Sequence, residues 1–129
     1  MRVRGFLLFC LILLFASCAP PPQETGVFEG HVTIGPLVPV VREGEPEPTP
    51  APEVYASRQI VIYASDGRTE VARVQIDGKG NYRVELAAGT YVVDINHVGI
   101  DMAKWLPRTV EIVAGQVTRL DLDIDTGIR

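Results

Sequence analysis

Residues 77–91 read DGKGNYRVELAAGTY, and this stretch decides the fold. It begins with a glycine-rich turn over residues 77–81. Beyond the turn, apolar and charged side chains alternate: Tyr82, Val84 and Leu86 with Arg83 and Glu85. Because successive side chains of a strand point to opposite faces, this alternation predicts a strand with one buried face and one solvated face. Gly89 then opens a second strand directly after the first.

The same kind of pattern extends from this stretch to both sides. Short runs rich in β-branched and aromatic residues predict strands at 28–34, 59–63, 69–76, 82–86, 89–96, 109–113 and 117–124. In the last run, Leu120, Leu122 and Ile124 are expected to face inward, and Asp121, Asp123 and Asp125 outward. About seven short strands predict an all-β fold, a single antiparallel β-sandwich over 26–125 with a tail at 126–129.

The segment 35–57 interrupts the strand pattern. It contains a run of prolines and glutamates: Pro36, Pro39, Pro46, Pro48, Pro50 and Pro52 with Glu43, Glu45 and Glu47. Proline lacks the amide that a sheet requires and glutamate resists burial, so the segment is predicted to be a solvated loop. Residues 41–53 are expected to be mobile and dispensable for folding. The alternative is a docking peptide, because proline-rich segments are already extended.

The first 17 residues have the composition of an export signal. Arg2 and Arg4 precede the apolar run 6–15, and about ten residues are too few to cross a bilayer as a helix, which takes roughly 20. Ala16 and Ser17 end the run. A basic start, a short apolar stretch and small residues at its end are typical of a secretory signal, so residues 1–17 are predicted to be removed.

Cys18 would be the one cysteine of the mature chain, because Cys10 lies within the signal. A single cysteine cannot form an internal disulfide, so another role is expected. The stretch LFASC, residues 14–18, resembles the lipobox of bacterial lipoproteins, although Phe15 stands where a smaller aliphatic residue is usual. The resemblance implies cleavage before Cys18 and a thiol that carries a diacylglycerol, whose acyl chains include those of the palmitate type. The alternative is an ordinary signal cut near Ala19, which would leave Cys18 free or remove it.

A lipid anchor on Cys18 would hold the protein at a membrane, since two or more acyl chains bind a bilayer stably. Residues 18–25 contain three consecutive prolines and are predicted to be an extended spacer. Lipoproteins kept at the inner membrane carry an aspartate after the cysteine, whereas this chain has Ala19. The resemblance therefore implies the outer membrane of a two-membrane cell, or the outer face of the cytoplasmic membrane in a cell with one.

The net charge limits the partners of the mature domain. The formal charge of −4 becomes −6 once Arg2 and Arg4 leave with the signal, and the rest of the chain has no cluster of lysine and arginine. This acidic balance argues against nucleic acid as a partner.

The stretch 77–91 also resembles the carboxypeptidase regulatory-like and transthyretin-like (prealbumin-like) sandwich domains. These families share an aspartate, a glycine before an aromatic residue, alternating apolar residues, then leucine and Gly-x-Tyr. The matching residues here are Asp77, Gly80, Tyr82, Val84, Leu86, Gly89 and Tyr91. The resemblance spans about 26–125, with a connection at 35–57 much longer than the usual first turn. It implies a β-sandwich that serves as a non-catalytic module.

Physical reasons suggest that the shared residues build the fold rather than a site. Gly80 and Gly89 suit backbone angles that a side chain would oppose, and Tyr82 and Leu86 belong to the buried face of their strand. Tyr91, two residues after Gly89, resembles a tyrosine corner, in which the hydroxyl bonds to nearby backbone.

Trp105 lies in a connection between two predicted strands. It is expected to cap one end of the core. The alternative is an exposed platform for a sugar or an anchor for a protein. A ligand-binding protein should gather exposed aromatic residues beside Trp105, whereas a scaffold should bury it.

Few residues of the mature chain suit catalysis or metal binding. Its histidines are His31, expected on the outward face of the first strand, and His97, expected at a strand end. A nucleophile elbow and a cysteine–histidine pair are both missing from the sequence. The aspartates at 121, 123 and 125 lack the glycine and glutamate of an EF-hand, and Asp94 with His97 is too small a set for zinc. The sequence predicts no enzymatic activity, no metal and no cofactor.

Two functions remain open from the sequence. The first is a membrane-anchored, non-catalytic lipoprotein of the cell envelope that acts as a structural or protein-interaction module. The second is a ligand-binding lipoprotein whose loops hold a carbohydrate or peptide for a partner envelope system. The expected partners are membrane lipid through Cys18 and an envelope protein or glycan.

Overall fold

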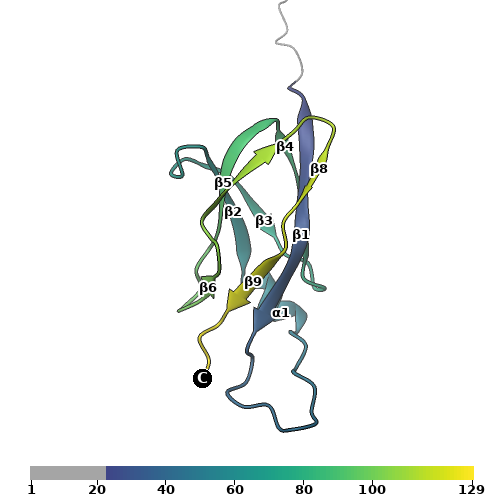
Figure 1. The fold of residues 1–129 in the computed structure, drawn as a ribbon, viewed down its shortest axis with the longest axis vertical. Coiled ribbons are helices and arrows are strands. Elements are labelled where there is room, and N and C mark those ends of the chain that lie inside the picture. The colour runs from purple at the N-terminus through teal and green to yellow at the C-terminus, as the bar shows by residue number, and fades with distance from the viewer. Residues whose placement is uncertain (1–22) are drawn as a thin grey trace, which may run out of the picture.

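Residues 23–129, the part of the chain that the computed structural model describes, form two β-sheets that pack face to face (Figure 1). The prediction of an all-β sandwich is confirmed. The predicted signal peptide, Cys18 and most of the spacer lie outside the described residues. Within them, no helix is both long and apolar enough to cross a bilayer.

The first sheet contains the first and the last strand of the described chain. Its strands are β1 (Thr25–Gly35), β4 (Asn81–Ala87), β6 (Met102–Ala103), β8 (Val117–Arg119) and β9 (Leu122–Asp125). Their order is β4-β1-β9-β6, with β8 also paired to β1. Neighbours are antiparallel except that β1 pairs in parallel with β8 and β9. Parallel neighbours need a long connection, and here the whole second sheet intervenes in sequence.

The second sheet is antiparallel throughout. Its strands are β2 (Gln59–Ala64), β3 (Glu70–Gln75), β5 (Gly89–Ile95) and β7 (Arg108–Ile112), in the order β3-β2-β5-β7. β4 and β5 are joined by one residue, Ala88, so the pair predicted from residues 82–96 passes directly from one sheet to the other. The two-residue strand β6 is an addition to the predicted elements, since its segment has no alternating pattern.

Alternate side chains of both sheets fill the core, as the sequence pattern predicts. The buried ones are Phe28, Val32, Ile34, Tyr82, Leu86, Leu122 and Ile124 from the first sheet and Ile60, Ile62, Val74, Val93, Ile95, Val110 and Ile112 from the second. The rings of Phe28 and Tyr82 meet edge to face, with centroids 5.4 Å apart. Asp121 and Asp123 are exposed on the opposite face, as expected.

The last predicted strand is divided into β8 and β9 by Leu120 and Asp121. At the break, the His31 amide donates to the Asp121 carboxylate at 2.8 Å, so a side chain replaces the main-chain acceptor. The buried Tyr82 hydroxyl donates to the Leu120 carbonyl oxygen. Gly30 lies so close to this carbonyl group that a Cβ atom there would be 1.8 Å from its oxygen. These contacts hold the break against β1.

The proline-rich segment differs from the prediction at its C-terminal end. Residues 39–49 are exposed and project from one end of the molecule as a loop (Figure 1). However, Pro52–Ala56 forms the short helix α1, which buries Tyr55 in the core. The helix packs close to Gly80, where a Cβ atom would be 3.0 Å from the Tyr55 ring and 2.8 Å from the Val32 carbonyl oxygen. The C-terminal end of the segment is therefore part of the core, because Tyr55 is buried there and Val54 packs against the same cluster.

Candidate functional site

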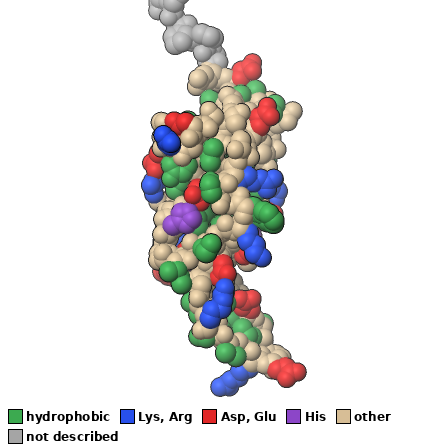
Figure 2. All heavy atoms as spheres, turned by 60° about the vertical axis from the view of Figure 1, so that its left-hand side comes forward, with side chains coloured by type: hydrophobic (Ala, Val, Ile, Leu, Met, Phe, Trp, Pro, Cys, Tyr) green, Lys and Arg blue, Asp and Glu red, His purple; other side chains and the backbone are tan. Residues whose placement is uncertain are grey.

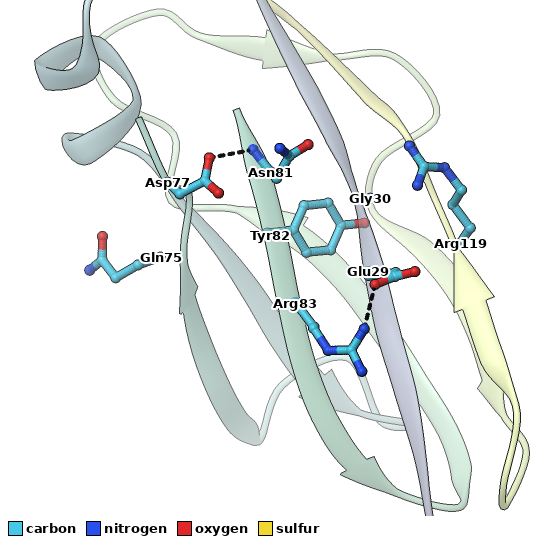
Figure 3. Close-up of a pocket in the computed structure, with 8 residues that line it drawn as sticks. All are labelled: Glu29, Gly30, Gln75, Asp77, Asn81, Tyr82, Arg83 and Arg119. Atoms are coloured by element: carbon cyan, nitrogen blue, oxygen red, sulfur yellow. Dashed lines mark hydrogen bonds and ion pairs between the residues drawn. The ribbon is translucent and has the colours of Figure 1, made fainter. Parts of the chain in front are cut away.

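A polar hollow of about 420 Å³ lies beside β1 and β4 (Figure 3). Arg83 points toward Glu29 and its Nη1 atom lies 2.8 Å from Oε2 of that residue. The Asp77 carboxylate accepts hydrogen bonds from the backbone amides of Asn81 and Lys79 in its own turn, and these bonds lower the pKa of its carboxyl group. Arg119 lies 3.1 Å from Asp121. Each of these charged groups already has a partner within the protein. They therefore stabilise the sheet, and the hollow is the weaker candidate for a ligand-binding site.

The connection between β5 and β7 is the stronger candidate. It covers residues 96–107, here called the distal loop, and contains β6. Its side chains Ile100, Met102 and Trp105 are 72%, 71% and 84% exposed. Figure 2 brings forward the side of the molecule where β6 lies in Figure 1, and hydrophobic side chains reach the surface there between charged ones. Three large apolar side chains this exposed within six residues make the loop a candidate contact surface.

The exposure of Trp105 contradicts the expectation that it caps the core. The core at this end is closed by other groups, including the buried Tyr55 of α1. The other exposed large apolar residues of the loop are Val98, Ile100 and Met102, and none of them is aromatic. The arrangement therefore matches neither of the two expected outcomes, a buried tryptophan or a cluster of exposed aromatic rings.

The backbone of the distal loop is held in an unfavourable conformation. His97 and Trp105 have φ angles of 45° and 67°, and among the described residues they are the non-glycine residues with positive φ. Such angles cost on the order of 1–3 kcal/mol each and persist only where the surroundings enforce them. Both positions fall in the segment that also exposes the apolar side chains. This coincidence supports a functional role for the loop.

A buried ion pair fastens the middle of the distal loop to the sandwich. Arg58, just before β2, donates from Nε to Asp101 Oδ2 at 2.7 Å and from Nη2 to Oδ1 at 3.2 Å. The two side chains are 12% and 4% exposed. A paired, bidentate geometry of this kind is specific in direction, so it fixes the position of the loop.

A shallow apolar groove of about 460 Å³ runs beside this ion pair. Its apolar lining comes from Val98 and Ile100 of the loop and from Leu37, Val54 and Ile128. The groove therefore joins the distal loop to the segments around α1 and the C-terminus. It extends the exposed apolar surface beyond the loop itself.

Several residues singled out in the sequence lie elsewhere in the fold. The Tyr91 hydroxyl donates to the Ala87 carbonyl oxygen at 2.6 Å, four residues upstream. Gly89 has room around it, since a Cβ atom would be 3.9 Å from the nearest atom of Tyr91. His31 contacts Asn81 on the outer face of the first sheet. Cys18 lies outside the described residues, and within 23–129 no three acidic, histidine or cysteine side chains gather as a metal site would require.

Sequence reasoning missed the residues that organise the distal loop. Arg58 and Asp101 are 43 residues apart, and no spacing rule connects them. The helix that contains Tyr55 has a signal that could have been used, since Pro52 followed by Glu53 is typical of a helix start.

No model of a protein family matches the sequence, and no curated protein matches it. Similar solved structures exist. The minor pilin GBS52 of Streptococcus agalactiae is 16% identical with a TM-score of 0.54, over 80% of this chain and 45% of that one. The major pilin subunit BcpA of Bacillus cereus is 18% identical with a TM-score of 0.48, over 78% and 29%. A DUF3823 family protein from Parabacteroides merdae is 14% identical with a TM-score of 0.48, over 79% and 46%.

The chain thus spans less than half the length of these three structures. At such identities the likeness to the minor pilin shows the fold alone, a β-sandwich.

Proposed function

We propose that this protein is a lipoprotein of the cell envelope, anchored through Cys18, whose sandwich presents the distal loop to a protein partner. The proposal rests on the exposure of Trp105 together with Ile100 and Met102. The sandwich itself is a non-catalytic module of the carboxypeptidase regulatory-like or transthyretin-like kind. Its likeness to a minor pilin is in keeping with a structural role.

The position of the loop relative to the chain start supports a partner away from the anchoring membrane. The first residues of β1 lie at one end of the sandwich, whereas β6 and α1 lie at the other (Figure 1). Six residues, 19–24, separate Cys18 from β1, so the distance from Cys18 to Thr25 is at most about 25 Å. The 11 residues of β1 then add roughly 35 Å. An anchor on Cys18 would therefore keep the start of β1 near the bilayer, with the distal loop at the opposite end of the sandwich.

The chemistry of the loop favours a protein over a carbohydrate. Sugars bind on aromatic faces with polar groups around them, while protein interfaces combine aromatic anchors with aliphatic contacts. Trp105 is accompanied by Ile100 and Met102, and the adjoining groove is lined by further aliphatic residues. This combination is typical of a protein-binding surface.

The contacts of the two histidines support a non-catalytic role. The His31 ring lies 3.0 Å from the Asn81 side chain. The His97 ring lies 3.0 Å from the Asp94 carboxylate and 3.3 Å from the Asp101 carbonyl oxygen. Each imidazole is thus engaged in holding a turn or a strand end. A general base instead faces the group whose proton it removes.

A photoreactive phenylalanine analogue at position 105 of the full chain tests the interaction in living cells. We expect a crosslink to a protein, with no comparable product when the analogue replaces Val71, which is also exposed but lies on β3. Trp105→Ala should abolish the partner's co-purification and change the free energy of unfolding by no more than about 0.5 kcal/mol. A crosslink that forms equally well from position 71 contradicts the proposal.

The anchor is tested separately by Cys18→Ser. We expect this variant to leave the membrane fraction while its domain keeps the unfolding curve of the parent, because the anchor and the core are separate. Mass spectrometry of the mature parent protein should show an acylated N-terminal cysteine. An unmodified N-terminus at Ala19 or later would disprove lipidation.

A further inference from the structure

His97 lies between two groups that can only accept hydrogen bonds. Its Nε2 atom is 3.0 Å from Asp94 Oδ1, and its Nδ1 atom is 3.3 Å from the Asp101 carbonyl oxygen. A neutral imidazole carries one N–H, so it can donate to one of these acceptors but not to both. Both bonds form together only when each ring nitrogen holds a proton. The geometry therefore suits the imidazolium form of His97.

We infer that protonation of His97 fastens the distal loop and so regulates how its apolar side chains are presented. The inference rests on the proposed function of that loop. With a protonated ring, the end of β5 is bridged to Asp101 in the middle of the loop. When the proton leaves, the ring keeps one N–H and one of the two bonds is lost, so the bridge from β5 through His97 to Asp101 is broken.

The groups around His97 favour the protonated form. Asp94 comes from β5, and its carboxylate is oriented by the Ile95 amide, which donates to it at 2.8 Å. Asp101 presents its carbonyl oxygen to the ring, while its carboxylate is paired with Arg58 from the start of β2. The hydrogen bond to Asp94 raises the pKa of His97 above its usual 6.5, and partial burial opposes this rise.

Because the pKa of His97 is raised in the folded protein, the attachment of the distal loop depends on pH. When folding raises the pKa of a group, the protonated group stabilises the folded state. This stabilisation is fully present at a pH below the pKa of the unfolded chain, and it is lost as the pH rises through the pKa of the folded protein. The loop is therefore fastened in mild acid and released as the pH rises through the raised pKa of His97. The positive φ of His97 adds to the release, because it needs surrounding contacts to persist.

NMR on the mature chain as isolated from cells tests this inference. The imidazole resonances of His97 should titrate with a midpoint above 6.5, and Asp94→Asn should lower that midpoint. Amide protection of residues 98–103 should fall by roughly two- to tenfold across the same midpoint, the factor that one net hydrogen bond contributes. His97→Asn should remove the transition, and asparagine tolerates the positive φ at this position. The matched control is His31→Gln, which should leave the transition unchanged.

The outcomes separate this inference from the proposed function. A His97 midpoint at or below 6.5, or loop protection that does not change across it, overturns the inference, while crosslinking from position 105 would still support an interaction site. A transition at the raised midpoint supports the inference. If it is accompanied by a crosslink from position 105 that strengthens or weakens across the same pH range, regulation of the site is established. A crosslink that is independent of pH overturns the regulatory part.

Discussion

Arg58 and Asp101 form a bidentate ion pair that connects the start of β2 to the middle of the distal loop. The two residues are 43 positions apart, and both side chains are withdrawn from water. Arg58 also donates from Nη1 to the Val54 carbonyl oxygen at 3.0 Å. One guanidinium group thus links α1, β2 and the distal loop. The loop can expose its apolar side chains because this pair holds its backbone.

Removing one partner of this ion pair should destabilise the fold strongly. Asp101→Ala leaves the Arg58 guanidinium buried without its counter-charge, and we expect a loss of about 3 kcal/mol in urea unfolding. The matched control is Glu70→Ala, which breaks the exposed pair with Arg73 and should cost no more than about 1 kcal/mol. Equal losses in the two variants would show that the buried pair has no special role.

The two tyrosine hydroxyls that donate to backbone should differ in their effect. Tyr91→Phe leaves the Ala87 carbonyl group without its partner and should cost about 1–3 kcal/mol. Tyr82→Phe should cost more, because Tyr82 is buried and its partner is the Leu120 carbonyl group at the break between β8 and β9. Denaturant unfolding of both variants gives the comparison. If Tyr91→Phe were as stable as the parent, the corner would make no contribution.

Gly30 should tolerate no side chain. In Gly30→Ala the new methyl group would overlap the Leu120 carbonyl oxygen and approach the Tyr82 hydroxyl, so we expect a loss above about 3 kcal/mol or failure to fold. Gly115→Ala is the control. Its φ is +72° but no atom lies within 4 Å, so strain alone should cost about 1–2 kcal/mol. Circular dichroism during thermal unfolding compares the two.

The proline-rich segment should divide into a dispensable part and an essential part. Shortening residues 41–49 to a few residues should change the free energy of unfolding by no more than about 1 kcal/mol, because closure entropy varies slowly with loop length. Tyr55→Ala should cost about 3–5 kcal/mol, since it removes a buried aromatic ring. A large loss from the loop deletion would instead show that the exposed residues pack on the sandwich.

The sequence by itself determined the strands and their buried faces. Tyr82 and Leu86 could be assigned to the core because a period of two is a local property, readable from a few neighbouring residues. Leu122 and Ile124 followed from the same alternation. The division of their strand into β8 and β9 did not, since it depends on the approach of Gly30 and Tyr82 from distant parts of the chain.

Only the tertiary structure decided which irregular segments pack and which remain exposed. Tyr55 and Trp105 are both aromatic residues outside the predicted strands, yet one is buried and the other is 84% exposed. Irregular segments have no periodicity that would distinguish the two cases. Their burial depends on where the sheets leave room: α1 fits against Gly80, which has no side chain, whereas the distal loop is held outward by Asp101. Such contacts join residues far apart in the chain, so they exist only once the sandwich has formed.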